Sequence, residues 1–434
     1  MTDQIARLPD VPLEERRRRI EAEAGKTPEV LYDERERRVR DAIMNRTPDR
    51  VPLFILPEPV KYAGLGHAAE FYDPRSWKKA VQAETLYLQP DMALGGFGSS
   101  GRAWELLGVL NRLWPGGPLP PTYEYQFVEG EYMKEDEYDH FLSNPGDFIV
   151  RRLLPRVYSS LEPLADLPPL ANMFFGFEHL TPMFTSPAFV RLAEVLRQAG
   201  AEVQRYRDEN GDVYEEMALL GFPAFSTFGG AGGAPFDTLS SFLRGMEGSM
   251  IDMFRRPEKL LRACDLILEM RIASAVPADP SKRGNPKRVG LPLWRGDLCF
   301  MSDRQFERFY WPGLKKALQA SVDLGFVPLP FFEAPYGERL ARLRELPADS
   351  IIAFVDSRDV RLARKALRGH TCLITTAPGS VKYWTLQQTE EFYKTVIDDC
   401  ADGGGLMLNV TFPDSATPEQ KKAMLDSLKA YGRY

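Results

Sequence analysis

A carboxyl side chain closes one of the most apolar runs in the sequence. Glu333 directly follows Phe326–Phe332. Removal from water disfavours the charged form of a carboxyl group and raises its pKa, so Glu333 could act as a general acid or base, or bind a metal ion. The alternative is a buried ion pair between Glu333 and an arginine such as Arg295 or Arg339.

Polar groups follow two other apolar runs in the same way. Arg295 and Asp297 come after Val289–Trp294, and Asp297 has the same two interpretations, chemistry or structural pairing. Asp356 and Asp359 follow a third run, but Asp359 is placed to cap the next helix, so a structural role is favoured there. Asp297 is therefore the second candidate for acid–base chemistry, with Arg295 beside it.

A glycine-rich segment, GGAGGAPFD at residues 229–237, follows the apolar run Gly221–Phe228. Its glycines precede a helix predicted from about Phe236. They could let the backbone approach a ligand, or they could form a plain turn. A phosphate cradle is the least favoured interpretation, because the spacing matches no phosphate-loop pattern.

The histidines give a weaker signal. His370 and Cys372 form an HxC pair that is typical of metal sites, but the pair enters its predicted strand instead of leaving it, so we favour ordinary packing. His179, beside Glu178, is either a satisfied loop residue or a contributor to a site. The sequence has no GxSxG, HExxH or phosphate-loop motif.

The elements that must position these residues alternate between strands and helices. From residue 285 onward the order strand, loop, helix occurs five times. Two earlier strands make seven, and the eighth is either Met92–Leu94 or Asn172–Phe177. The predicted strands are Val51–Leu56, Gly221–Phe228, Val289–Trp294, Phe326–Phe332, Ile351–Val355, Thr371–Thr375 and Gly405–Val410.

This alternation predicts an α/β fold, a (β/α)8 TIM barrel with an N-terminal helical extension and an irregular insertion. A doubly wound open sheet is the alternative, but no GxGxxG follows the first strand. We expect the extension over residues 1–48, the barrel over 49–434 and the insertion at about 96–169, where it could serve as a lid or a dimer contact. Arg16–Arg19 are flanked by glutamates, which favours a solvated helix face.

Composition narrows the function classes. The 434 residues carry 55 Lys and Arg against 61 Asp and Glu, a net charge of −6, which argues against a nucleic-acid-binding protein. No apolar run approaches the roughly 18 residues that a membrane span needs. The N-terminus lacks a secretory apolar region, and the four cysteines are widely spaced, so we expect a cytoplasmic protein with free thiols.

Four segments together resemble the uroporphyrinogen decarboxylase-like superfamily. They are residues 36–53, 234–260, 300–318 and 403–432. Their order and spacing fit from about residue 35 to the end, with the insertion poorly covered. The resemblance implies a TIM barrel. True uroporphyrinogen decarboxylases carry an Arg-rich segment after the first strand, whereas residues 57–72 here contain no arginine, which argues against a tetrapyrrole with many carboxylates.

The other branch of that superfamily contains corrinoid-dependent methyltransferases. Members that act on thiols usually hold zinc through an HxC pair at a strand end and a distant cysteine. The corresponding positions here are Phe331 and Glu333, with Asn409, Val410 or Thr411 in the last strand. One glutamate does not rebuild that site, so we expect no metal ligands and a doubtful role for zinc.

The resemblance therefore implies a corrinoid-linked methyltransferase, which moves a methyl group between a small, largely apolar substrate and a corrinoid on a separate protein. Glu333 would be the general acid or base, and Asp297 would orient the substrate. The expected substrate-binding residues are Arg295, Tyr336, Phe228, Phe331, Trp294, His179 and Asn409. Phe332 and Trp384 would also line the cleft, although such aromatics equally suit a core.

Two alternatives stay open. One is a decarboxylase or other lyase acting on a non-porphyrin carboxylate, which would need several arginines in the cleft; Arg244, Arg295 and Arg339 are the candidates. The other is a barrel that has lost catalysis. Fold alone does not decide among them. A homodimer through the aromatic-rich insertion is a further expectation.

Overall fold

Short parallel strands alternate with helices over most of the chain. The computed structural model describes residues 11–58, 64–94, 98–227, 229–279 and 287–434. The main sheet has the order β1-β8-β7-β6-β5-β4, and every neighbouring pair is parallel. Its strands are β1 (Leu53–Phe54), β4 (Arg288–Leu293), β5 (Val327–Phe332), β6 (Ile352–Val355), β7 (Cys372–Thr376) and β8 (Leu406–Asn409). The predicted α/β class is confirmed.

Hydrogen bonds continue beyond these six strands. The backbone N–H of Asp91 donates to the carbonyl oxygen of Leu53 in β1 (2.8 Å), and Ala93 forms a parallel bridge to Ala224. Segment 91–93 is therefore bonded both to β1 and to segment 223–227. Of the two candidates for the remaining predicted strand, residues 92–94 are the ones in this position.

The second of these segments reaches the far edge of the sheet. Thr227 forms a parallel bridge to Val289 in β4, and the N–H of Gly290 donates to the carbonyl oxygen of Thr227 (2.8 Å). The two outer strands of the sheet, β1 and β4, are thus connected through segments 91–93 and 223–227.

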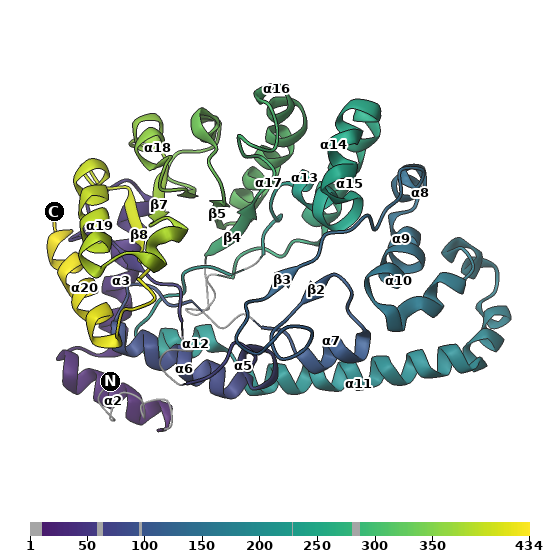
Figure 1. The fold of residues 1–434 in the computed structure, drawn as a ribbon, viewed down its shortest axis with the longest axis horizontal. Coiled ribbons are helices and arrows are strands. Elements are labelled where there is room, and N and C mark those ends of the chain that lie inside the picture. Colours follow the sequence, from purple (N-terminus) through teal and green to yellow (C-terminus); the bar gives the residue numbers. More distant parts are fainter. Residues whose placement is uncertain (1–10, 59–63, 95–97, 228, 280–286) are drawn as a thin grey trace.

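Helices cover the outer side of the sheet. In Figure 1, α15, α17, α18, α19 and α20 follow one another around it. The described α-helices are α2 (Leu13–Ala24), α3 (Pro28–Ile43), α5 (Ala69–Tyr72), α6 (Pro74–Leu88), α7 (Gly101–Leu107), α8 (Tyr138–Ser143), α9 (Pro145–Phe148), α10 (Leu154–Val157), α11 (Pro187–Asn210), α12 (Val213–Leu219), α13 (Pro235–Leu239), α14 (Gly245–Arg255), α15 (Pro257–Ser274), α16 (Asp303–Gln305), α17 (Trp311–Asp323), α18 (Val360–Leu367), α19 (Leu386–Cys400) and α20 (Pro418–Tyr431).

Other helical turns connect them. The π-helical turns are η2 (Ile149–Leu153), η6 (Ser240–Arg244) and η7 (Phe306–Tyr310), and the 3-10 helices are η3 (Ser159–Asp166), η4 (Leu170–Phe175), η5 (Phe177–Thr185), η8 (Gly337–Glu345) and η9 (Gly379–Tyr383). Three of the described helices, α16, α19 and α20, begin with a capping box. Thr385 at the start of α19 and Thr417 at the start of α20 each exchange hydrogen bonds with a glutamine three residues later.

The strands bury side chains on both faces, which explains their continuous apolar runs. One face, with Leu293, Phe332 and Leu408 among others, packs against the helices. The opposite face carries a second cluster that includes Phe54 and Phe225, whose rings stack with centroids 3.7 Å apart. Alternate residues of one strand therefore belong to different clusters.

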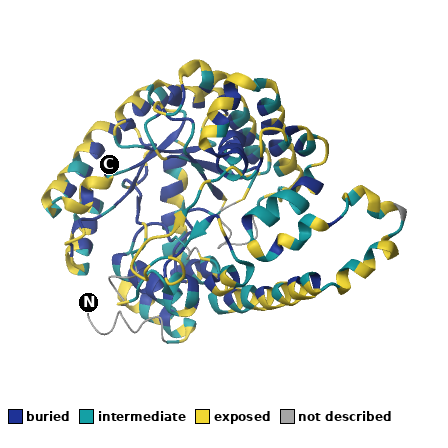
Figure 2. Ribbon diagram, turned by 45° about the vertical axis from the view of Figure 1, so that its right-hand side comes forward, coloured by how far each residue is buried: buried dark blue, intermediate teal, exposed yellow. Residues whose placement is uncertain are grey.

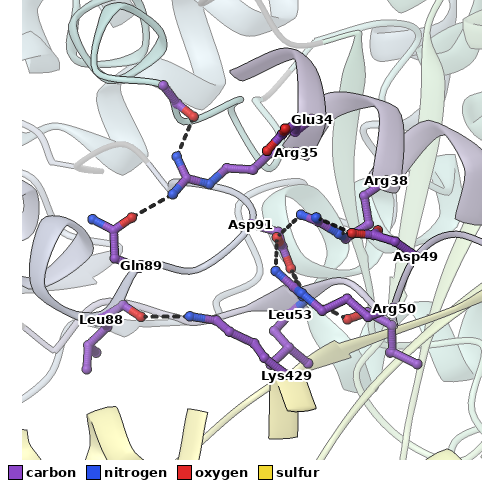
Figure 3. A network of polar contacts seen from close by, with 12 residues as sticks. Glu34, Arg35, Arg38, Asp49, Arg50, Leu53, Leu88, Gln89, Asp91 and Lys429 are labelled. Carbon is purple, nitrogen blue, oxygen red and sulfur yellow. Dashed lines mark hydrogen bonds and ion pairs between the residues drawn. The ribbon is translucent and has the colours of Figure 1, made fainter. Parts of the chain in front are cut away.

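A buried charge network lies at the N-terminal end of β1 (Figure 3). The carboxylate of Asp91 has no exposed surface and accepts hydrogen bonds from Arg38 (2.7 Å), Arg50 (2.6 and 2.7 Å) and the N–H of Leu53 (2.8 Å). Burial opposes the ionisation of Asp91, but the Arg50 and Arg38 guanidinium groups outweigh it and hold its pKa below the usual value. Arg50 thus connects the turn before β1 to the segment before residue 92.

The N-terminal extension packs on the body of the protein. Arg16 in α2 is buried and donates to the side-chain oxygen of Gln82 in α6 (3.0 Å), and Ile20 joins an apolar cluster with Leu86. The expectation of a wholly solvated face at Arg16–Arg19 is therefore wrong for Arg16, whose guanidinium anchors α2.

The insertion contains more regular structure than expected. It includes α7 and a two-stranded antiparallel sheet of β2 (Arg112–Leu113) and β3 (Gln126–Phe127). Short helical segments then continue past residue 169 to η5. Figures 1 and 2 show α11, which follows, running along one side of the molecule with much of its length exposed. None of the described helices combines the length and apolar character that crossing a membrane requires.

Candidate active site

The loops after β4 and β5 meet at the C-terminal edge of the sheet. Leu293 and Phe332 are register partners, and the N–H of Glu333 donates to the carbonyl oxygen of Leu293 (3.1 Å). Further along, the N–H of Leu298 donates to the carbonyl oxygen of Pro335 (3.0 Å). Residues 294–298 and 333–336 therefore lie side by side, as expected for consecutive parallel strands.

Glu333 is an ionisable side chain at this edge for which the described residues show no structural task. Its side chain is accessible to solvent, yet the surrounding protein desolvates the carboxyl group and raises its pKa, against the opposing charge of Arg295. Among the described residues, no side chain forms a hydrogen bond or an ion pair with this carboxyl group. The apolar run before Glu333 led us to expect scarce water at this carboxyl group, whereas the structure leaves the side chain exposed.

Neither arginine forms the ion pair that was the alternative for Glu333. Arg295 pairs with Glu129 and donates through Nε to the hydroxyl of Ser240 (3.1 Å). Arg339 is buried and donates to the carbonyl oxygens of Gly296 (3.0 Å) and of two further loop residues, besides pairing with Asp303. Both guanidinium groups hold loops in place.

Asp237, in the first turn of α13, is a site residue that the sequence analysis noted only as the end of the glycine-rich segment. Its carboxylate accepts hydrogen bonds from the N–H of Arg295 (3.0 Å), the N–H of Trp294 (3.4 Å) and the hydroxyl of Tyr310 (2.8 Å). Burial raises the pKa of Asp237 to about 7, although these three donors favour its charged form. Asp237 therefore fixes the backbone from which Trp294 and Arg295 project.

Two tyrosines extend this contact beneath the loop. The hydroxyl groups of Tyr310 and Tyr336 lie 3.2 Å apart, and the N–H of Gly296 donates to Tyr336 (3.1 Å). Both tyrosines are fully buried, so Tyr336 has no surface to offer a substrate in this conformation. A Cβ atom at Gly296 would lie 2.4 Å from the Tyr310 ring and 2.7 Å from the Tyr336 ring, so the packing requires glycine there.

A second layer of contacts surrounds Arg295. Glu129, beyond β3 in the insertion, accepts a hydrogen bond from the hydroxyl of Ser241 (2.7 Å) as well as pairing with Arg295. The indole N–H of Trp294 donates to the same hydroxyl of Ser241 (2.9 Å). The insertion thus reaches the site through Glu129, a contact that the distance along the sequence concealed.

The predicted acid–base residue Asp297 holds a turn. Its Oδ1 accepts hydrogen bonds from the N–H groups of Cys299 (2.6 Å) and Phe300 (3.1 Å). Asp359 is the N-cap residue of α18, but its side chain makes no capping hydrogen bond there; its Oδ2 accepts from the N–H groups of Tyr336 (2.7 Å) and Gly337 (3.0 Å), which is a structural role of another kind. These carboxylates shape the two loops that flank Glu333.

Of the predicted substrate-binding residues, Trp294, Phe331 and Asn409 lie at the same edge or on the same face of the sheet. Trp294 and Phe331 are half-buried, and the ring of Phe331 packs against Phe354 with centroids 4.5 Å apart. Asn409 is buried, and its side-chain oxygen has no hydrogen-bond partner among the residues that the structure describes. That orphaned acceptor could receive a hydrogen bond from a bound molecule.

The structure does not bring His179 or Trp384 to this place. His179 is exposed in η5, whose neighbours are α11 and η4. Trp384 packs against Phe392 within the cluster on the helix side of the sheet. Phe228 lies outside the described residues.

The donors for a zinc site do not assemble. His370 precedes β7, at the end of the strand opposite to the Glu333 loop, and its ring contacts Thr371 (2.9 Å), while Cys372 is completely buried. In the described part of the chain, no group of three His, Cys, Asp or Glu side chains could hold a metal ion. The described residues therefore do not fit zinc.

No family model matches the chain, and no curated protein matches its sequence. Among solved structures, the chain is similar to a methyltransferase from Methanosarcina mazei, with a TM-score of 0.52 and 13% sequence identity. The match covers 91% of this chain and 98% of that one. At this identity the likeness concerns the fold, which the two proteins share over nearly their whole lengths.

Proposed function

We propose that this protein is a methyltransferase that moves a methyl group between a small, largely apolar substrate and a corrinoid carried by a separate protein. The observation that carries the proposal is Glu333. It is an accessible carboxyl group with a raised pKa and no structural partner among the described residues, at the strand ends of a fold shared with a methyltransferase.

The fold proposed for this activity is a closed (β/α)8 barrel. The hydrogen bonds of segments 91–93 and 223–227 support closure of the barrel, because they connect β1 to β4 through two further extended segments. The six strands of the sheet and these two segments make eight. In such barrels the active site lies at the C-terminal ends of the strands, where Glu333, Trp294 and Arg295 are found.

The chemistry proposed for Glu333 is proton transfer, which its raised pKa favours. When a methyl group leaves an oxygen or nitrogen atom, that atom keeps the bonding electron pair and becomes basic. A carboxylic acid with a raised pKa can give its proton to this atom as the bond breaks, and the resulting carboxylate can take a proton back from an acceptor in the reverse direction. Glu333 would thus balance the charge of the departing group.

A thiol substrate is the less suitable choice for this site. Thiolate activation in the resembling enzymes relies on soft metal ligands, and here Phe331, Glu333 and Asn409 stand in their places. Oxygen or nitrogen methyl donors, whose leaving atoms need protonation, match a glutamic acid better. The earlier expectation that Asp297 orients the substrate becomes an indirect role, through the turn that it holds.

The arginines favour methyl transfer over the lyase alternative. A decarboxylase site needs free guanidinium groups around the reacting carboxylate. Arg244 is buried between Asp252 and Glu131, Arg339 binds loop carbonyl groups, and Arg295 pairs with Glu129. The three arginines that the sequence suggested for decarboxylation therefore have other partners.

The test is an anaerobic assay with cob(I)alamin and a panel of aryl methyl ethers, methylamines and methylthioethers, followed by the absorption of methylcobalamin. We expect methylation from an ether or amine donor and a loss of about 100-fold or more in Glu333→Gln. The matched control is Glu338→Gln, a nearby exposed glutamate. Unchanged activity in Glu333→Gln would remove Glu333 from the mechanism, and CO2 release from a carboxylate without methylation would favour the lyase.

A further inference from the structure

A small cavity opens beside the candidate site, between β4 and the glycine-rich segment. Its volume is about 210 Å³. Asp237 and Trp294, which belong to the site, also line it. The lining also includes Gly232, Gly233, Thr238, Phe242, Arg271 and Pro292.

The cavity lies beside the last described hydrogen bond between segment 223–227 and β4. Among the described residues, that bond is the one from the N–H of Gly290 to the carbonyl oxygen of Thr227. Pro292, the next residue facing the same way, has no N–H to continue the ladder. The glycine-rich segment then passes with little side-chain volume, and an unfilled space is left along the edge of β4.

Arg271 of α15 places a positive charge in this cavity. Its guanidinium is half-buried and donates to two neutral acceptors, the carbonyl oxygen of Gly233 (3.2 Å) and the hydroxyl of Thr238. These bonds leave Nε and one hydrogen on each Nη. Within the described ranges, no carboxylate forms an ion pair with Arg271; Asp237 is the acidic group whose charge it senses.

Glycine at position 232 is matched to this arginine. Gly232 has φ +75, and a Cβ atom there would lie 2.9 Å from Nη1 of Arg271. A side chain would therefore displace the guanidinium from the wall of the cavity. The positive φ of Gly232 and its lack of a side chain therefore leave room for the Arg271 guanidinium at the wall of the cavity.

We propose that this cavity binds the carboxylate end of the substrate, with Arg271 as its anchor. The inference rests on the proposed methyl transfer and adds a substrate class, namely an aromatic or apolar molecule with a carboxylate. A half-buried guanidinium with free donors is the side chain that best matches the two oxygens of a carboxylate. Phe242 and Trp294 supply aromatic walls for the ring next to it.

The cavity is large enough for one end of a substrate molecule but not for a whole one. Pockets for complete ligands commonly have volumes of about 300–1,000 Å³, above the 210 Å³ here. A molecule anchored on Arg271 would extend past Trp294 and Asp237, the residues that connect the cavity to the Arg295 loop. Its far end would then carry the methyl group. The anchored carboxylate is not the reacting group.

The experiment measures binding without any methyl transfer. Benzoate and its neutral isostere benzamide are titrated into the wild-type protein by calorimetry, and then into Arg271→Met and Arg262→Met. Arg262 is an exposed arginine on the same helix and serves as the matched control. Benzoate should bind at least about tenfold more tightly than benzamide, and Arg271→Met should remove that preference while Arg262→Met keeps it.

Equal binding of the two probes, no binding of benzoate, or an unchanged benzoate affinity in Arg271→Met would each overturn the proposal. If Arg271→Met does not fold, Arg271→Lys replaces it; a loss of about tenfold in benzoate affinity supports the need for the guanidinium fork, and no loss contradicts it. Failure here leaves the methyl-transfer assay untouched. Benzoate binding through Arg271 in a protein that transfers no methyl group would instead refute the proposed function and keep the carboxylate site.

Discussion

The hydroxyl of Tyr310 donates to the carboxylate of Asp237 across 2.8 Å, and both side chains are buried. Asp237 stands in α13, which follows segment 223–227, and Tyr310 ends η7, which follows β4. The contact therefore joins the helical segment after 223–227 to the helical segment after β4. Because Asp237 also accepts from the N–H groups of Trp294 and Arg295, it determines where the loop after β4 lies.

Tyr310→Phe should destabilise the protein by about 1–3 kcal/mol, because it removes a donor and leaves a buried carboxylate oxygen with a weaker partner. The pH dependence has a defined sign. Burial raises the pKa of Asp237 to about 7, so its contribution to stability is present below the unfolded pKa near 4 and is lost as the pH rises through about 7.

Urea unfolding at pH 5 and pH 8 measures this effect. Asp237→Asn should lose less unfolding free energy than the wild type between the two values, because its side chain does not ionise. Tyr310→Phe should lose more, because a donor that lowers the pKa is gone. Equal losses in all three proteins would mean that Asp237 ionises in the folded state as it does in water.

The pH profile of activity tests the role of Glu333 as an acid. Its pKa is raised by desolvation and lowered by the Arg295 charge, so activity should fall as the pH increases through that raised pKa. Arg295→Met removes the opposing charge and should move this fall in activity to higher pH. Arg295→Lys keeps the charge and should leave the pH of the fall nearly unchanged. If the pH at which activity falls shifts equally in both variants, the shift comes from a structural effect of position 295.

A single methyl group at position 296 should disturb the site. Gly296→Ala places a Cβ atom within 2.4 Å of the Tyr310 ring, so both tyrosines must shift. We expect a loss of about 1–3 kcal/mol in stability, together with reduced activity. Gly379→Ala is the control, because its added Cβ would meet no atom within 4 Å. Thermal unfolding of both variants decides the comparison.

The charge network around Asp91 should support stability without affecting chemistry. Arg50→Met leaves part of a fully buried carboxylate uncompensated and should cost about 3–5 kcal/mol. Asp49→Asn alters a half-exposed partner of Arg38 and should cost about 1 kcal/mol or less. Chemical denaturation measures both, and the rate per folded molecule should be unchanged. A large change in that rate for Arg50→Met would contradict the separation of the two ends.

The sequence alone predicted the six strands of the main sheet and the loops that meet beside Glu333, because strand ends follow from apolar runs and parallel strands share an end. It did not predict β2 and β3, and the predicted strand Gly221–Phe228 appears as isolated bridges. It could not predict what Asp297 and Asp359 bind, since both carboxylates accept from backbone N–H groups whose direction depends on the loop. The roles of Asp237 and Glu129 could not be predicted for another reason. Their partners, Tyr310 and Arg295, lie far away in the sequence, and no local pattern reports such a contact.

The division between the two ends of β1 and β5 bears on how this protein can change. The Asp91 network holds the chain at one end, whereas Glu333 at the other end has no structural partner among the described residues. A substitution at position 333 should then alter reactivity at little cost to folding. Descendants of such a chain could acquire a new substrate by changing this edge, while the charges around Asp91 preserve the scaffold on which selection acts.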